Sequence, residues 1–226
     1  MTVSAIDESQ RKAARVVGWA YLLALPPALF GEFAATASNL MAHQRLFRLG
    51  IACNLAAFAL VAVLIAALYV VLKPVNRHLA LLAACWGLIE TSILVGATLG
   101  DLGALRVLSG ADSLRALEAD RLQALAWLAL GAHRDAYHVG LVMGGLRSTL
   151  FCLLWLRSNF IPKPLAAWGV FSSLLLATCT YASIIFPELA KIVTVGYYGG
   201  PIFIFELTVG FWLLLKELRP SGQRVA

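Results

Sequence analysis

The sequence predicts an all-α membrane protein: a polytopic transmembrane bundle of six spans, with a further surface-lying helix between spans three and four. Of the 226 residues, 61% are hydrophobic and 13% are charged, whereas soluble domains are roughly half apolar and about a quarter charged. The mean hydropathy is +0.82. Several apolar runs reach the roughly 20 residues that a helix needs to cross ~30 Å of hydrocarbon. We therefore expect one transmembrane domain over residues 1–226, surrounded by the lipid bilayer.

The apolar runs are bounded by short polar or basic segments. Residues 1–15 are polar, and the turns Lys73–His78 and Arg157–Pro164 separate consecutive runs. Proline removes a backbone donor, so Pro26 and Pro27 should kink the first helix. We expect that helix to be retained rather than cleaved as a signal, because five more spans follow it. The predicted spans cover about residues 16–35, 49–72, 79–99, 136–156, 165–186 and 195–215.

The long connection between the third and fourth spans has the pattern of an interfacial helix over about residues 112–131. Asp112 and Ser113 are good N-cap residues, and Gly131 follows the last apolar position. A leucine stripe faces a polar side. The leucines are Leu114, Leu117, Leu125 and Leu128, and the polar residues are Arg115, Glu118, Asp120 and Arg121.

Six spans place both termini on one side of the membrane, and the basic residues indicate which side. Ten Lys and Arg residues fall on the terminus side and six on the opposite side. The positive-inside rule therefore predicts that both termini are cytoplasmic.

Composition also excludes several classes of function. The net charge of +6 does not indicate nucleic-acid binding, because the basic residues stand at predicted helix ends. The four cysteines lie within apolar runs without CxxC spacing, which indicates buried thiols. His133 and His138, with Asp135 between them, are too few for a metal site, so we expect neither a metal nor a cofactor. No feature indicates the oligomeric state.

Three charged residues fall near the middle of predicted spans: Glu90, Arg147 and Glu206, each about eleven residues from the start of its span. A charge at the bilayer centre costs about 2.5–3.5 kcal/mol on insertion scales, so such residues face the interior and pair. We expect a midplane polar cluster in which Arg147 bridges the two glutamates. A purely structural ion pair that orients helices is the alternative.

A second group of polar residues is predicted near the outer surface. Gly-xxx-Gly pairs in the same outer half, at residues 96/100, 140/144 and 196/200, predict that spans three, four and six pack closely together. The candidate outer polar layer consists of Glu32, Asn54, Asp101, His133, Asp135 and His138, with Arg134 and Tyr137 beside them. Tyr197 and Tyr198 are assigned to the outer aromatic belt.

Several short segments, spread over nearly the whole chain, combine residue types in an unusual way. The most specific of them is the stretch from Leu68 to Asn76 (LYVVLKPVN). The other segments are Arg11-Lys12 with Arg15, Tyr21–Leu23, Gly31–Phe33, Leu46–Gly50, His133, Gly140-Leu141, Arg157-Ser158 with Pro162, and Glu206 ahead of Trp212–Leu214. In these segments the chain resembles a bacterial membrane-protein family catalogued only as a domain of unknown function. It departs from the family's pattern at Met143-Gly144, where two aromatic residues before a glycine are expected. The resemblance implies a six-helix inner-membrane protein and supplies no activity, substrate or cofactor.

Three kinds of function remain open. The first is a membrane protein that binds or modifies a lipophilic small molecule, with buried carboxylates and His138 moving protons and Arg147 holding an anion. The second is a small proton-coupled transporter that uses the midplane acids as its coupling site. The third is a structural or regulatory subunit whose polar core only fixes packing. No catalytic or nucleotide-binding motif decides whether the protein is an enzyme.

Overall fold

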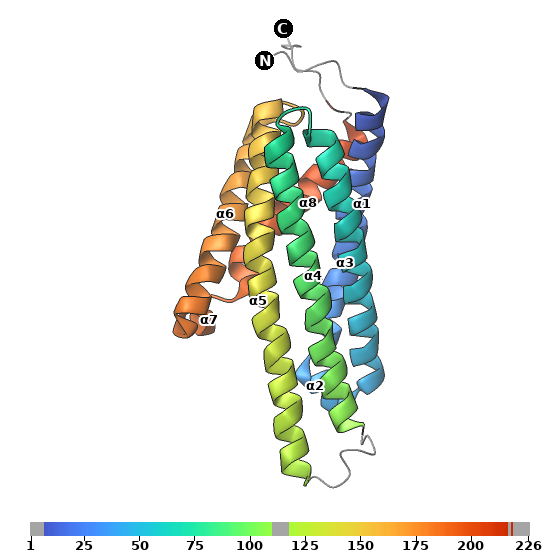
Figure 1. Cartoon of the computed structure of the whole chain (residues 1–226), viewed down its shortest axis with the longest axis vertical. Helices are drawn as coiled ribbons and strands as arrows, with labels where there is room; N and C mark the ends of the chain where they lie inside the picture. Colours follow the sequence, from blue (N-terminus) through green and yellow to red (C-terminus); the bar gives the residue numbers. More distant parts are fainter. Residues whose placement is uncertain (1–6, 110–117, 217, 219–226) are drawn as a thin grey trace.

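The computed structural model describes residues 7–109, 118–216 and 218, and this part of the chain contains eight α-helices and no strand. Six of the helices are long and apolar enough to cross a membrane, so the prediction of a six-span helical membrane protein is confirmed. Two short helices connect them (Figure 1). The helices are α1 (Glu8–Ala34), α2 (Ala37–Ala42), α3 (Gln44–Leu72), α4 (Arg77–Leu108), α5 (Ala119–Ser158), α6 (Lys163–Ile185), α7 (Pro187–Ile192) and α8 (Val195–Leu215).

The six long helices form a closed ring in chain order. Each packs against the long helices before and after it, and α8 packs against α1. The start of α1 and the end of α8 lie at the same end of the bundle, which we call the terminal end; the opposite end is the far end (Figure 1). At the far end α3, α4 and α5 extend beyond α6 and α8.

The length of α5 is the largest departure from the predicted spans. The helix has 40 residues, which corresponds to ~60 Å at 1.5 Å per residue and is about twice the ~30 Å thickness of the hydrocarbon layer. The 32-residue α4 is also longer than its predicted span. Both helices are therefore longer than the hydrocarbon layer is thick.

The predicted surface helix over residues 112–131 is not a separate element in the described part of the chain. Residues 112–117 lie outside the described residues, and residues 119–131 are the first turns of α5, continuous with the fourth span. A glycine in a helix costs only about 1 kcal/mol, so Gly131 alone does not end α5. Ala126 is buried in a small core at the far end, which holds this part of the helix in place.

Several helix ends are set by side-chain caps that the sequence encodes locally. Asp7 and Gln10 form a reciprocal capping box at the start of α1. The Asn76 side chain accepts a hydrogen bond from the Leu79 amide at the start of α4, with an oxygen–nitrogen distance of 3.0 Å. At the end of α5, Asn159 has a φ of 58°, the left-handed conformation that commonly ends helices. Pro26 and Pro27, the residues expected to kink the first helix, lie inside α1 and do not end it; the helix continues to Ala34.

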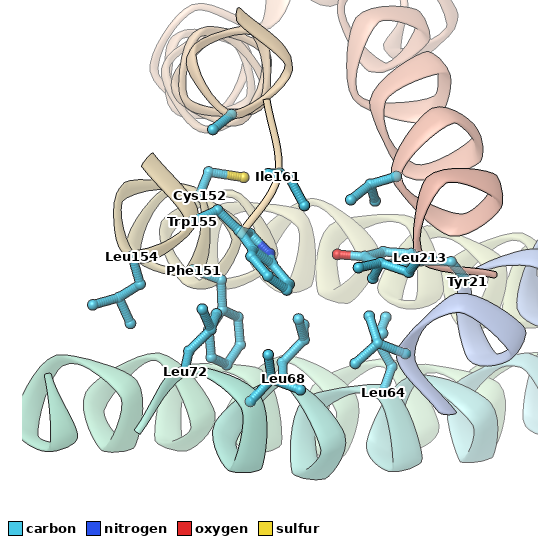
Figure 2. Close-up of a cluster of buried hydrophobic side chains, with 14 of the residues drawn as sticks. Tyr21, Leu64, Leu68, Leu72, Phe151, Cys152, Leu154, Trp155, Ile161 and Leu213 are labelled. Atoms are coloured by element: carbon cyan, nitrogen blue, oxygen red, sulfur yellow. The ribbon is translucent and has the colours of Figure 1, made fainter. Parts of the chain in front are cut away.

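Two hydrophobic cores lie at opposite ends of the bundle. The larger one fills the terminal end, where Trp155 and Phe151 of α5 meet Leu68 and Leu72 of α3 (Figure 2). The smaller one, around Phe47, joins α2, α3, α4 and α5 at the far end. The middle of the ring, between the two cores, contains the polar residues described next.

Candidate functional site

A cavity of about 1070 Å³ lies inside the ring, between α1, α4, α5, α6 and the segment from α7 into α8. It extends from Arg134 and Thr194 toward the terminal end as far as Arg147 and Glu206. Beyond these residues the ring is filled by side chains of the terminal-end core, among them Phe151. The cavity is therefore closed toward the terminal end. Its polar lining residues are Glu32, Glu90, Arg134, Tyr137, His138, Arg147, Ser148, Thr194, Tyr198 and Glu206.

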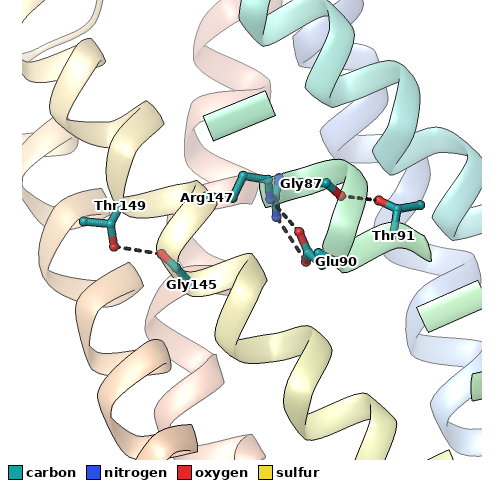
Figure 3. Close-up of polar contacts among 6 residues, drawn as sticks. All are labelled: Gly87, Glu90, Thr91, Gly145, Arg147 and Thr149. Atoms are coloured by element: carbon teal, nitrogen blue, oxygen red, sulfur yellow. Dashed lines mark hydrogen bonds and ion pairs between the residues drawn. The ribbon is translucent and has the colours of Figure 1, made fainter. Parts of the chain in front are cut away.

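An ion pair between Arg147 of α5 and Glu90 of α4 lies at the inner end of the cavity (Figure 3). Arg147 Nε lies 2.7 Å from Glu90 Oε2, and Arg147 Nη2 donates a hydrogen bond to Glu90 Oε1 at 3.4 Å. Each residue is only 6% exposed. The contact between Nε and Oε2 is a close approach of opposite charges without hydrogen-bond geometry, so the single hydrogen bond of the pair is the one from Nη2.

Two glycines make room for this pair. A Cβ at Gly87 would lie 2.5 Å from Cδ of Arg147, and a Cβ at Gly144 would overlap the Glu90 carboxylate. The nearby hydroxyls of Thr91 and Thr149 donate to carbonyls of their own helices, at 2.8 Å and 2.7 Å, and so do not compete for the charged groups. The space for the ion pair is therefore built into the backbone of both helices.

Glu206 lines the same cavity from α8. Its side chain is neither fully buried nor fully exposed. Among the described residues it forms no ion pair with Arg147, which pairs with Glu90. The prediction was that Arg147 bridges both glutamates. In the structure Arg147 contacts Glu90 but forms no ion pair with Glu206. Glu206 thus lies on the cavity wall without an ion-pair contact to any described residue.

Asp101 and His133 form a second polar contact between α4 and α5. His133 Nδ1 lies 3.0 Å from Asp101 Oδ2 and 3.2 Å from the Ala97 carbonyl oxygen. Asp101 is buried at 1% exposure. The His133 ring also stacks on Tyr137, with ring centroids 6.3 Å apart. Tyr137 lines the cavity, so this contact adjoins the site.

The other residues of the predicted outer layer do not share one place. Glu32 and His138 line the cavity. Asn54 is buried on α3 and packs against Gly31 of α1, where any Cβ would overlap its side chain. Asp135 is exposed and is not a lining residue. The layer therefore divides into cavity residues, helix-packing residues and one surface residue.

Two sequence interpretations change in the structure. Gly196 and Gly200 line the cavity rather than pack against α4 or α5, and a Cβ at Gly200 would meet no atom within 4 Å. Tyr198, assigned to an aromatic belt, is 3% exposed and faces the cavity. The spacing of Tyr198, Ile202 and Glu206, four residues apart, was the available signal, because it puts all three on one face of a helix.

The described residues contain no group of three or more His, Cys, Asp or Glu side chains arranged to hold a metal ion. All four cysteines are free thiols, and the prediction that they are buried holds only for Cys152: Cys85 is exposed, and Cys53 and Cys179 are partly exposed. The chemistry that the arrangement offers is therefore that of carboxylates, a paired guanidinium, imidazole and phenol groups.

Comparison with protein families gives a match to one family over residues 13–216, described as a domain of unknown function (DUF4386). The match covers most of the chain, so the protein belongs to this family. Comparison with curated proteins and with solved structures gives no match.

Proposed function

We propose that this member of the DUF4386 family binds an amphipathic small molecule, with the apolar body in the cavity and the polar end at its inner wall. The observation that carries the proposal is the cavity itself. Its volume of about 1070 Å³ is at the upper end of the ~300–1,000 Å³ typical of small-molecule sites, which combine apolar walls with a few polar groups.

The residues that line the cavity form an apolar wall with a few polar groups. Leu29, Leu141 and Leu176 contribute apolar wall, whereas Glu206 and the Arg147–Glu90 pair are polar. Glu206 follows Val195, the first residue of α8, by about eleven residues or ~16 Å, close to half of the ~30 Å hydrocarbon layer. Burying a polar group at that depth is costly unless it is hydrogen-bonded. A ligand with one polar end satisfies this condition.

The start of α8 offers a route for entry. Gly196, Gly199 and Gly200 line the cavity there, and the short helix α7 precedes them. A Cβ at Gly200 would meet no atom within 4 Å, so neighbouring side chains do not crowd this part of the wall. A molecule dissolved in the bilayer can approach the cavity along this segment.

Photolabelling tests the proposal. The purified chain in lipid nanodiscs would be irradiated with a diazirine-bearing long-chain alcohol, a neutral probe, and the labelled peptides identified by mass spectrometry. We expect saturable labelling of cavity-lining peptides of α5 and α8. Gly200→Phe, which adds a phenyl group to the cavity wall, should reduce it strongly. Gly96→Phe is the matched control, because Gly96 is also free of neighbours within 4 Å but does not line the cavity. Equal labelling of all three proteins would refute binding in the cavity.

A proton-coupled transporter is the second candidate, favoured by the closure of the cavity toward the terminal end. The cavity reaches the middle of the bundle and is closed toward the terminal end, as a transporter is in one of its alternating states. In such a transporter Glu206 would bind and release the proton that is coupled to transport. Vesicles containing the protein and an internal pH-sensitive dye should then show proton flux when a cell extract is added, and Glu206→Gln should abolish it. Ligand binding without any such flux would exclude this candidate.

We also infer a bacterial inner-membrane location with the terminal end in the cytoplasm. The inference is supported by the distribution of Lys and Arg, ten on the terminus side against six on the other. Fusions at the C-terminus test it: green fluorescent protein should fluoresce and alkaline phosphatase should be inactive. The reverse result would invert the topology.

A further inference from the structure

The charges that line the cavity do not balance. Three carboxylates (Glu32, Glu90 and Glu206) and two guanidiniums (Arg134 and Arg147) line it, and the imidazole of His138 lies one helical turn from Arg134. Arg147 is occupied by Glu90, with which it forms the 2.7 Å contact. Arg134 is 13 residues away from Arg147 on the same helix, or ~20 Å along its axis. The inner end of the cavity therefore carries one carboxylate, Glu206, in excess of its cations.

Aromatic rings line the same cavity. Tyr198 and Phe203 of α8 and Tyr137 of α5 all contribute to its wall. Phe203 is three residues before Glu206 on α8 and so one helical turn away on the same face, whereas Tyr198 is eight residues or ~12 Å away along the axis. The face of an aromatic ring attracts a cation, and the attraction increases when the cation is desolvated. The carboxylate and the aromatic rings therefore both favour a cation in this cavity.

We propose that the ligand is a lipophilic cation, an amphipathic amine or quaternary onium compound, whose charged group lies against Glu206. Its apolar substituents lie along Tyr198, Ile202 and Leu176. The proposal rests on the proposed function, because it specifies the ligand of the same cavity. An anionic amphiphile is disfavoured, since the one guanidinium at the inner end already has its carboxylate.

Two probes of the same shape and opposite charge test the proposal on the unaltered chain. Tetraphenylphosphonium is a cation and tetraphenylborate an anion with the same four phenyl groups. Equilibrium binding to the chain in zwitterionic nanodiscs would be measured for each, with empty nanodiscs subtracted. We expect saturable binding of the phosphonium and none of the borate. Saturable binding of the borate at equal or higher affinity would overturn the proposal.

Variants then locate the binding. Glu206→Gln should weaken phosphonium binding by about tenfold or more, as expected for loss of a desolvated charge partner. Glu8→Gln is the control, because Glu8 is an exposed acid at the start of α1 that pairs with Lys12. Phe203→Leu, which removes the lining ring one turn from Glu206, should also weaken binding and keeps the test informative if Glu206→Gln does not fold. Unchanged affinity in both cavity variants would refute the proposal.

The outcome for this inference is separable from the outcome for the proposed function. If the neutral alcohol labels the cavity and Gly200→Phe reduces the labelling, but the borate binds as well as the phosphonium, the cavity binds lipophiles without preference for cations. If the alcohol fails to label the cavity in every variant, the proposed function itself fails.

Discussion

Arg147 and Glu90 face each other across the contact between α4 and α5, with Nε of the one 2.7 Å from Oε2 of the other. Both are almost fully buried, and a glycine on each helix leaves them space. The pair links the two helices at the inner end of the cavity and occupies the only guanidinium among the described residues there. Glu206 is left as the available charge for this reason.

The first prediction concerns the coupling between these two residues. Arg147→Met or Glu90→Gln alone should destabilise the fold by about 3–5 kcal/mol, because each leaves a buried charge or its hydrogen-bonding groups unpaired. The double variant should lose clearly less than the sum of the two. Thermal unfolding in detergent of the unaltered protein, the two single variants and the double variant gives the coupling energy as a double-mutant cycle. The exposed pair Glu8 and Lys12, also 2.7 Å apart, is the control and should show almost no coupling. Additive losses for the buried pair would contradict the prediction.

A second prediction concerns the contact between Asp101 and His133. Asp101→Ala removes a buried acceptor and leaves the His133 ring with the Ala97 carbonyl as its remaining polar contact. We expect a loss of about 1–3 kcal/mol, the usual cost of leaving a buried polar group unsatisfied. The effect should be local to the far end. Hydrogen exchange should show faster amide exchange around Leu105 and Ala126, with the terminal-end core unchanged. Uniform loss of protection would show instead that this contact supports the whole fold.

The third prediction is that replacing glycine by alanine changes the stability in opposite directions at two positions. A Cβ at Gly145 of α5 would lie 2.8 Å from Ala177 Cβ and 2.9 Å from the Ala177 backbone nitrogen, so α6 would have to move. Gly145→Ala should therefore destabilise the protein, by about 1–3 kcal/mol. Gly96→Ala meets no atom within 4 Å and should stabilise it by about 0.5–1 kcal/mol through helix propensity. Unfolding midpoints of the two variants measure both effects, and a loss of stability at Gly96 would mean that its face is covered.

The fourth prediction separates a projecting α5 from a helix lying on the membrane. Gln123 is exposed and lies 35 residues before Ser158 in α5, or ~53 Å along its axis. A spin label at residue 123 should be accessible to a water-soluble nickel chelate and insensitive to membrane-dissolved oxygen. A label at Val63, which is exposed in the middle of α3, should show the reverse. A label at residue 123 that oxygen reaches as readily as one at residue 63 would place this segment in the bilayer.

Much of the fold was accessible from the sequence because the bilayer imposes simple rules. A span needs about 20 apolar residues, so the number and approximate position of the six helices followed from hydropathy. The lengths of α4 and α5 did not follow from hydropathy, because their additional turns are held by packing around Phe47 and Ala126. Periodicity within residues 119–131 could not distinguish a surface helix from the continuation of a span.

The candidate site was accessible only in part for a related reason. The cost of a charge in hydrocarbon identifies Glu90, Arg147 and Glu206 as residues that face the interior of the bundle, and a one-dimensional depth estimate places them at one level. Which carboxylate receives the single guanidinium depends on the ring order, in which α4 packs on α5 while α8 packs on α1 and α6. The sequence by itself determined that this is a six-span membrane protein with charges inside. Only the tertiary structure decided that Arg147 pairs with Glu90 and that Glu206 faces a cavity, because direct pairing requires that two helices be neighbours at the right rotation.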